Sequence, residues 1–223
     1  MMKYPRVAID GPAGVGKSTT AEAVAKRLGY ARVDSGTLYR AITYILLKNS
    51  IKSFDSEITK ELISKIDFQV KSNKIIYENQ DISMFLRSVE VNNTVAEVAK
   101  VSFIREKVRR IQMDIINNTK EGLIVDGRDI GTVILPNADV KIFLTASIES
   151  RAKRRYEEMV KQKLNVAYDS ILKEISKRDY EDTTREIAPL KMAEDAILVD
   201  NSSMSFAEVV MKIISLINEK LKQ

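Results

Sequence analysis

Short apolar runs alternate along the chain with longer stretches in which apolar residues recur every three or four positions. The short runs end at Asp, Thr or small residues, which is typical of strands covered on both faces. These runs are Arg6–Asp10, Tyr30–Asp34, Leu123–Asp126, Val140–Thr145 and Ala196–Asp200. The longer stretches predict helices, and they cover Lys17–Leu28, Thr37–Lys48, Val89–Asn117, Ile148–Lys161 and Ser205–Lys222. The alternation predicts an α/β fold, a three-layer sandwich around a central parallel sheet of about five strands.

One region departs from this rhythm. Phe68–Ser72 and Lys74–Tyr77 alternate apolar and polar residues around a polar turn at Ser72-Asn73. Gln80–Ile82 follows a second polar turn at Glu78-Asn79. Short alternating runs joined by polar pairs predict a small antiparallel insertion. Because no repeat or low-complexity linker is present, we expect the insertion to sit on the main domain.

The composition restricts the chemistry. The sequence has no cysteine and no histidine, which excludes disulfides, thiolate nucleophiles, Cys/His zinc sites and histidine-based triads. No apolar run approaches the roughly 20 residues that span a bilayer, and the N-terminal segment lacks the pattern of a secretory signal. We therefore expect a cytoplasmic protein without membrane contacts.

A glycine-rich loop between the first predicted strand and helix fits G-x-x-x-x-G-K-[ST], the phosphate-binding P-loop. Glycines allow backbone N–H groups to turn toward phosphate oxygens, and the helix N-terminus adds a positive dipole end. In this motif Lys17 reaches the β- and γ-phosphates while Ser18 ligates Mg²⁺. The expected nucleotide-binding residues are Gly11, Pro12, Ala13, Gly14, Val15, Gly16, Lys17, Ser18 and Thr19.

The P-loop alone does not define a reaction, because ATPases, GTPases, motors and small-molecule kinases share it. The chain lacks the N-K-x-D motif usual in GTPases, and its 223 residues leave little room for the partner domains of a motor. The net charge of +5 fits either nucleic acid or several phosphates on a small ligand. Against a nucleic-acid-associated ATPase, aromatic residues make up only 6% and tryptophan is absent.

Arginine placement carries more information than lysine placement, because a guanidinium holds a phosphate through two parallel hydrogen bonds. Several arginines follow predicted strand ends or lie on the helices beyond them, so we expect them to converge on one cleft. They are Arg40, Arg105, Arg128, Arg151, Arg154, Arg155, Arg178 and Arg185.

Local patterns suggest roles for some of these residues and leave alternatives open. Ser35 and Arg40 are placed to face the phosphate of a second substrate, although Ser35 or Thr37 also fits an ordinary helix cap. Asp126 ends a predicted strand, where a carboxylate orients Mg²⁺ through water or simply caps a helix. Arg128 then lies at the mouth of the cleft.

Two helical segments carry charges at helical spacing. Arg151 and Arg155 share one helical face, but the segment RAKRRYEE equally fits a solvated face paired with glutamates 157 and 158. Arg178, Asp182 and Arg185 step by four and three along a further helix. Their shared face suits a ribose phosphate.

Together these segments resemble the bacterial cytidylate kinases, which are P-loop nucleoside monophosphate kinases. The resemblance runs nearly end to end. It rests on IDGPAGVGKST at 9–19, DSGTLYR at 34–40, VDGRDIGTVILPNADVKIFLTAS at 125–147 and RDYEDTTREIAPL at 178–190. It implies ATP-dependent phosphorylation of CMP, and usually of dCMP, by a monomer. It also implies one domain over residues 1–223, with a monophosphate-binding insertion at about 35–118 and a helical lid at about 149–180.

The resemblance further assigns roles by motif position. The acceptor phosphate would be held by Ser35, Arg40, Arg128, Arg178 and Arg185. Asp182 would contact the ribose, and Arg105 and Asp129 would read the cytosine edge. The expected catalytic set is Lys17, Arg128, Arg151, Arg155 and Arg178, and the expected metal-binding residues are Ser18 and Asp126.

The base pocket departs from the family pattern at one position. Some members carry a serine that contacts cytosine nine residues before the arginine matching Arg105, and here that position is Ala96. Thr94 or water could replace the hydroxyl, so the preference among CMP, dCMP and UMP stays open. Transfer to a different small acceptor is the nearest alternative activity.

Overall fold

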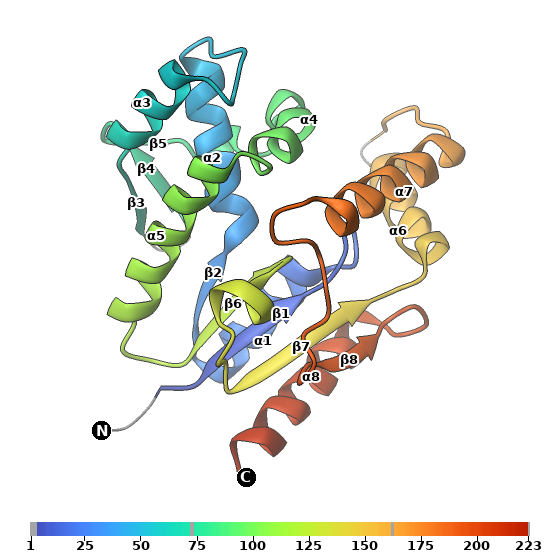
Figure 1. Ribbon diagram of the computed structural model, residues 1–223. Helices are drawn as coiled ribbons and strands as arrows, with labels where there is room; N and C mark the ends of the chain where they lie inside the picture. Colours follow the sequence, from blue (N-terminus) through green and yellow to red (C-terminus); the bar gives the residue numbers. More distant parts are fainter. Residues whose placement is uncertain (1–3, 72–73, 162, 223) are drawn as a thin grey trace. The chain divides into compact units, whose positions relative to one another are not determined.

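The computed structural model describes residues 4–71, 74–161 and 163–222 (Figure 1). Contacts divide the chain into two compact units, one formed by Met1–Val33 and Asn118–Gln223, the other by Asp34–Asn117. The turn predicted at Ser72-Asn73 lies outside the described residues. No helix in the described part of the chain is long and apolar enough to cross a membrane.

The first unit is built on a five-stranded sheet with the strand order β2-β6-β1-β7-β8. Its central strand β1 runs parallel to both β6 and β7, and β7 runs parallel to β8. The predicted parallel sheet is therefore confirmed. The strands are β1 (Arg6–Asp10), β2 (Ala31–Asp34), β6 (Leu123–Gly127), β7 (Val140–Thr145) and β8 (Ile197–Asp200).

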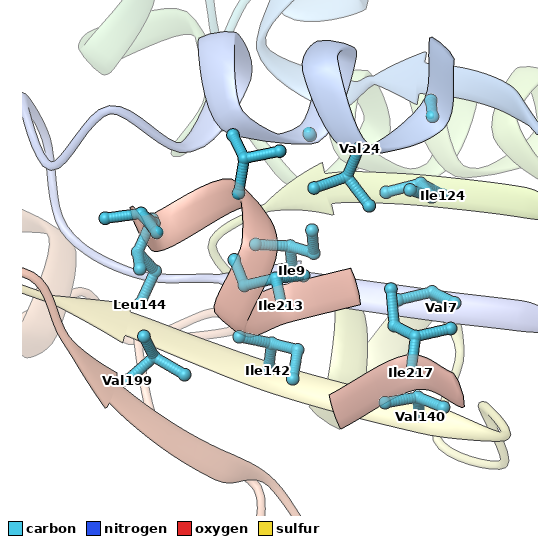
Figure 2. Close-up of a cluster of buried hydrophobic side chains, with 14 of the residues drawn as sticks. Val7, Ile9, Val24, Ile124, Val140, Ile142, Leu144, Val199, Ile213 and Ile217 are labelled. Carbon is cyan, nitrogen blue, oxygen red and sulfur yellow. The ribbon is translucent and has the colours of Figure 1, made fainter. Parts of the chain in front are cut away.

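Two helices, α1 (Lys17–Leu28) and α8 (Phe206–Leu221), cover the same face of this sheet. Alternate strand residues such as Ile9, Ile124 and Ile142 point toward them and form one buried cluster (Figure 2). Burying a side chain of this size contributes roughly 1.5–3 kcal/mol, so this layer supplies much of the unit's stability. Polar residues such as Asp10 and Asp126 stand at the carboxyl ends of the strands, and the site is built there.

A helical pair follows β7. Helices α6 (Ile148–Lys161) and α7 (Tyr168–Thr184) pack on each other through a small apolar cluster of Ala152, Ile171 and Ile175. The family resemblance implies a lid in this stretch. The sequence also suggested that Arg185 continues the helix, which is wrong. Arg185 lies just past the end of α7 with an extended backbone.

The second unit contains four α-helices and a three-stranded antiparallel sheet of order β3-β4-β5 within its described residues. The small antiparallel insertion is confirmed. Its elements are α2 (Ser35–Lys48), α3 (Glu57–Lys65), β3 (Phe68–Lys71), β4 (Lys74–Tyr77), β5 (Gln80–Asp81), the 3₁₀ turn Ser83–Phe85, α4 (Val89–Val98) and α5 (Ser102–Asn118).

The long helix predicted over Val89–Asn117 is interrupted between α4 and α5. The end of α4 tightens, with the N–H of Val101 donating to the Val98 carbonyl at 3.3 Å. The side chain of Arg105 then donates to the carbonyl of Ala99 at 3.1 Å. An arginine from the next helix therefore satisfies a carbonyl that the break leaves without a helical partner.

Candidate functional site

The loop between β1 and α1 depends on its glycines. Gly11 has φ of 151°, and a Cβ there would lie 2.0 Å from the carbonyl oxygen of Leu144 on β7. Gly16, which precedes α1, has φ of 88°. Any side chain at Gly11 would collide with backbone, and Gly16 needs a conformation that other residues adopt only at a cost. The sequence pattern of the P-loop thus matches its backbone requirement.

Lysine and arginine side chains hold carbonyls of this loop. Lys17 Nζ donates to the carbonyl of Pro12 at 2.8 Å, and Arg151 Nη1 donates to that of Ala13 at 3.0 Å. Burial, followed by the charge of Arg128, holds the pKa of the Lys17 ammonium well below its usual value. An anion bound beside Lys17 would stabilise the charged ammonium and raise its pKa.

Ser18 and Asp126, the two residues expected to serve the metal, are in contact. Ser18 Oγ donates to Asp126 Oδ2 at 3.0 Å. The second oxygen of Asp126 accepts a hydrogen bond from Arg32 Nε at 2.8 Å, and the Asp126 side chain is only 2% exposed. Arg32 lies on β2, next to the strand that carries Asp126. This arginine was not among the predicted site residues.

Arginines and aspartates expected at the acceptor also meet within the first unit. Arg128 Nε donates to Asp182 Oδ2 at 2.7 Å. Arg185 lies 3.8 Å from Asp182 and 3.9 Å from Asp129, measured between guanidinium nitrogen and carboxylate oxygen. Burial, together with the charge of Arg128, lowers the pKa of Arg178. The cluster therefore concentrates positive charge that two carboxylates only partly offset.

The electrostatics of Asp182 reflect this cluster. Burial acts to raise the pKa of its carboxyl, while the charge and the hydrogen bond of Arg128 act to lower it. The charges of Arg178 and Arg185 act in the same direction, so the pKa is lowered. Asp182 is thus held ionised among guanidinium groups.

Hydrogen bonds between side chains and backbone groups hold the two chain segments that carry this cluster. Asp10 at the end of β1 accepts hydrogen bonds from the N–H groups of Ile130 at 2.9 Å and Gly131 at 2.7 Å, immediately after Asp129. Arg185 Nε donates to the carbonyl of Ala188 at 2.7 Å, and Ala188 has a positive φ of 50°. A non-glycine residue in this conformation is uncommon, and here it belongs to the turn after α7 whose carbonyl holds Arg185.

The three arginines at the start of α6 have different surroundings. Arg151 is buried and forms two hydrogen bonds to Asp179 on α7, at 3.0 and 2.6 Å. Arg154 donates to Asn201 after β8 at 3.0 Å. Arg155 is half exposed and pairs with Glu158 at 2.8 Å, as expected for a solvated face. Arg151, on α6, therefore connects the loop after β1 with α7.

The second unit holds the other expected acceptor residues. Ser35 is buried and accepts a hydrogen bond from Gln112 Nε2 at 2.6 Å. Arg40 Nε donates to Asn92 at 3.4 Å, and the guanidinium of Arg105 lies 5.7 Å from the centre of the Tyr39 ring. Gln112 was not among the predicted site residues.

The suggested helix cap at Ser35 or Thr37 is wrong. Asp34 caps α2 by accepting the N–H of Thr37 at 3.1 Å. The hydroxyl of Ser35, in the first turn of α2, is therefore not used as a cap.

Comparison with known proteins identifies the family. A family model described as cytidylate kinase matches residues 7–219. A cytidylate kinase of Carboxydothermus hydrogenoformans is 43% identical, covering 96% of this chain and 98% of its own. One of Clostridium botulinum is 44% identical, covering 95% of this chain and 96% of its own. The chain belongs to the cytidylate kinase family.

The fold agrees with that membership. A solved structure of an uncharacterized protein from Eubacterium ventriosum superposes with a TM-score of 0.54 at 15% identity, covering 96% of this chain and 98% of that chain. At this identity the likeness concerns the fold alone. The family assignment rests on the sequence relatives, and family membership identifies the protein as a phosphotransferase.

The polar groups near the loop fit a metal that arrives with its nucleotide. Within the described part of the chain, no three carboxylates gather as a dedicated metal cage. Ser18 and Asp126 offer one hydroxyl and one carboxylate instead. Mg²⁺ in kinases is commonly held by one or two such groups together with substrate phosphates and water, so this cytidylate kinase family member has a suitable donor set.

Proposed function

We propose that this protein transfers the terminal phosphoryl group of ATP to CMP, and also to dCMP, forming CDP or dCDP and ADP. The observation that carries the proposal is the match to cytidylate kinases over nearly the whole chain. The P-loop contacts and the arginine cluster of the first unit support it, since two phosphorylated substrates need many cationic groups.

On the donor side, we assign the triphosphate to the backbone of Gly11–Thr19 and to Lys17. Ser18 and Asp126 would hold Mg²⁺, which would supply positive charge to neutralise the phosphates. Arg32 donates to Oδ1 of Asp126 at 2.8 Å and Ser18 donates to Oδ2 at 3.0 Å, so the two proposed metal-binding residues meet at Oδ2.

On the acceptor side, guanidinium groups are proposed to grip the phosphate of CMP. Asp182 would contact the ribose, while Arg105 and Asp129 would read the cytosine. The phosphate-binding residues of this proposal are Ser35, Arg40, Arg128, Arg178 and Arg185. Because Gln112 donates to the Ser35 hydroxyl, the hydroxyl's own proton remains available for a phosphate oxygen.

The reaction needs no histidine. An acceptor phosphate oxygen is already a nucleophile, so catalysis consists mainly of alignment and charge neutralisation. Lys17 and Arg128 would offset charge around the transferring group. We propose that Arg151 and Arg155 add to this when the lid closes and excludes water.

The activity test is direct. Purified protein with ATP and Mg²⁺ is offered CMP, dCMP, UMP and other small acceptors, and the nucleotide products are separated by ion-exchange chromatography. We expect CDP and dCDP. The absence of CDP would refute the proposed substrate, and phosphorylation of a different acceptor would redirect it. Sedimentation of the same preparation checks the proposed monomer.

Variants test the residue assignments. Arg40→Ala and Arg185→Ala should each lower turnover by about two decades or more, as loss of a charge-neutralising contact does. Arg110→Ala is the matched control, since this exposed arginine pairs with Glu106 on the surface of α5. Asp129→Ala should narrow the discrimination between CMP and UMP, and an unchanged ratio would contradict its role at the base.

A further inference from the structure

Three side chains from different parts of the first unit bind carbonyls of the P-loop. Lys17 holds the carbonyl of Pro12 and Arg151 holds that of Ala13. Asn201, just after β8, donates from Nδ2 to the carbonyl of Val15 at 2.9 Å. A trans peptide is planar, so its carbonyl and the following N–H point in opposite directions. Each held carbonyl therefore also sets the direction of the next N–H.

The bond from Asn201 to Val15 fixes the peptide that ends in the N–H of Gly16. Asn201 is 3% exposed, so water does not replace this bond easily. Its amide orientation follows from its partners: Arg154 can only donate to Oδ1, and the Val15 carbonyl can only accept from Nδ2. The Gly16 N–H is then presented on the side opposite to Asn201.

Asn201 is itself held at several points. Arg154 on α6 donates to both its side-chain and its backbone oxygen, at 3.0 and 2.5 Å. The backbone N–H of Asn201 donates to the Thr145 carbonyl at the end of β7, at 2.9 Å. A cation on the amide oxygen also polarises the amide and strengthens the bond that Nδ2 donates.

We propose that Asn201 is a positioning residue for the donor triphosphate, which acts by aiming the Gly16 N–H, with Arg154 holding it in place. This inference rests on the proposed use of the P-loop for ATP but not on the identity of the acceptor. A residue that acts through the peptide plane changes the affinity for phosphate groups. A residue that contacted adenine would change the affinity for ATP but not for tripolyphosphate. A residue that only supported the fold would change the affinity for all ligands alike.

The test measures binding by calorimetry for wild type, Asn201→Ala and Asn201→Asp. The ligands are ATP with Mg²⁺, inorganic tripolyphosphate with Mg²⁺, and CMP. Loss of one hydrogen bond to the loop should weaken ATP and tripolyphosphate binding about threefold to tenfold in Asn201→Ala. CMP affinity should change less than twofold. Asn218→Ala and Asn218→Asp, on an exposed position of α8, are matched controls.

The order of the two variants separates positioning from simple structural support. Asn201→Asp keeps the side-chain volume and an acceptor for Arg154, but it sets a carboxylate oxygen against the Val15 carbonyl. Positioning predicts that the Asp variant binds tripolyphosphate less tightly than the Ala variant, whereas structural support predicts the reverse. Thermal unfolding without ligand reports stability separately.

Several results would overturn the inference. Equal losses for CMP and ATP would indicate a general structural effect, and a loss for ATP without one for tripolyphosphate would indicate an adenine contact. If neither Asn201 variant folds, Arg154→Met decides, because unchanged triphosphate affinity in that variant removes the proposed link. Wild type that binds ATP but forms no CDP refutes the proposed function alone, while wild type that binds neither ATP nor tripolyphosphate refutes this inference.

Discussion

Asp10 should make the folded protein less stable as the pH rises through 6. Its carboxyl lies buried at the end of β1. The pKa of Asp10 is raised from 3.8 to about 6, chiefly by burial, and the charge of Asp129 acts in the same direction. The hydrogen bonds from Gly131 and Ile130 and the charge of Lys17 act to lower the pKa but do not cancel the rise.

The sign of the effect follows from proton linkage. Between about pH 4 and 6 the folded protein holds the Asp10 proton while the unfolded chain has released it. The stabilisation is therefore complete below pH 4 and is lost as the pH rises through 6. A rise of roughly two pKa units corresponds to about 3 kcal/mol, at 1.36 kcal/mol per unit.

Urea unfolding of wild type and Asp10→Asn between pH 4 and 8 measures this term. Asparagine has similar volume but does not titrate, and its lost acceptor adds a cost that is the same at every pH. The free energy of unfolding of the variant minus that of wild type should rise by about 3 kcal/mol between pH 4 and 7. Asp67→Asn, at an exposed position, controls for general charge effects. A difference that stays flat, or falls with pH, would refute the reasoning.

Three other substitutions test local features. Gly11→Ala places a Cβ 2.0 Å from a carbonyl oxygen of β7 and should prevent stable folding. Gly29→Ala, where a Cβ meets nothing within 4 Å, should lower the free energy of unfolding by only about 1–2 kcal/mol. Circular dichroism and urea unfolding compare the two variants. Arg128→Met leaves Asp182 among fewer cations and should lower the free energy of unfolding by about 2 kcal/mol at pH 7. The loss should shrink as the pH falls, because protonation of Asp182 removes the charge that Arg128 neutralises. Ala188→Gly relieves a positive φ of 50° and should raise thermal stability by up to about 1 kcal/mol; lower stability would show that the turn is not strained.

The strands and most helices could be predicted because their signals are local. The runs at β1 and β7 are mostly apolar, and the helices α1 and α6 have the predicted bounds. The helix α3, which the sequence analysis did not predict, has only nine residues and buries two of them, Thr59 and Ile63. The break before α5 was missed because the apolar spacing continues across it.

The candidate site divides in the same way. The P-loop is contiguous and the motif sets its backbone, so its residues could be read directly from the sequence. Arg32, Gln112 and Asn201 could not, because their partners lie 94, 77 and 186 residues away in the chain. The available signal was weak: Arg32 is a charged residue within a short apolar strand, and Gln112 is a polar residue on the buried face of α5.

The carboxylates of the arginine cluster explain how several guanidinium groups can pack near one another. Burial and then the charge of Arg128 lower the pKa of Arg178, and the negative charge of Asp182 acts against both. In the proposed reaction an acceptor phosphate brings the missing negative charge. Arg128 then no longer depends on Asp182 for neutralisation, and the carboxylate is released to accept a hydrogen bond from the ribose. In this proposal Asp182 offsets guanidinium charge within the fold and would recognise the sugar once the acceptor phosphate takes over that neutralisation.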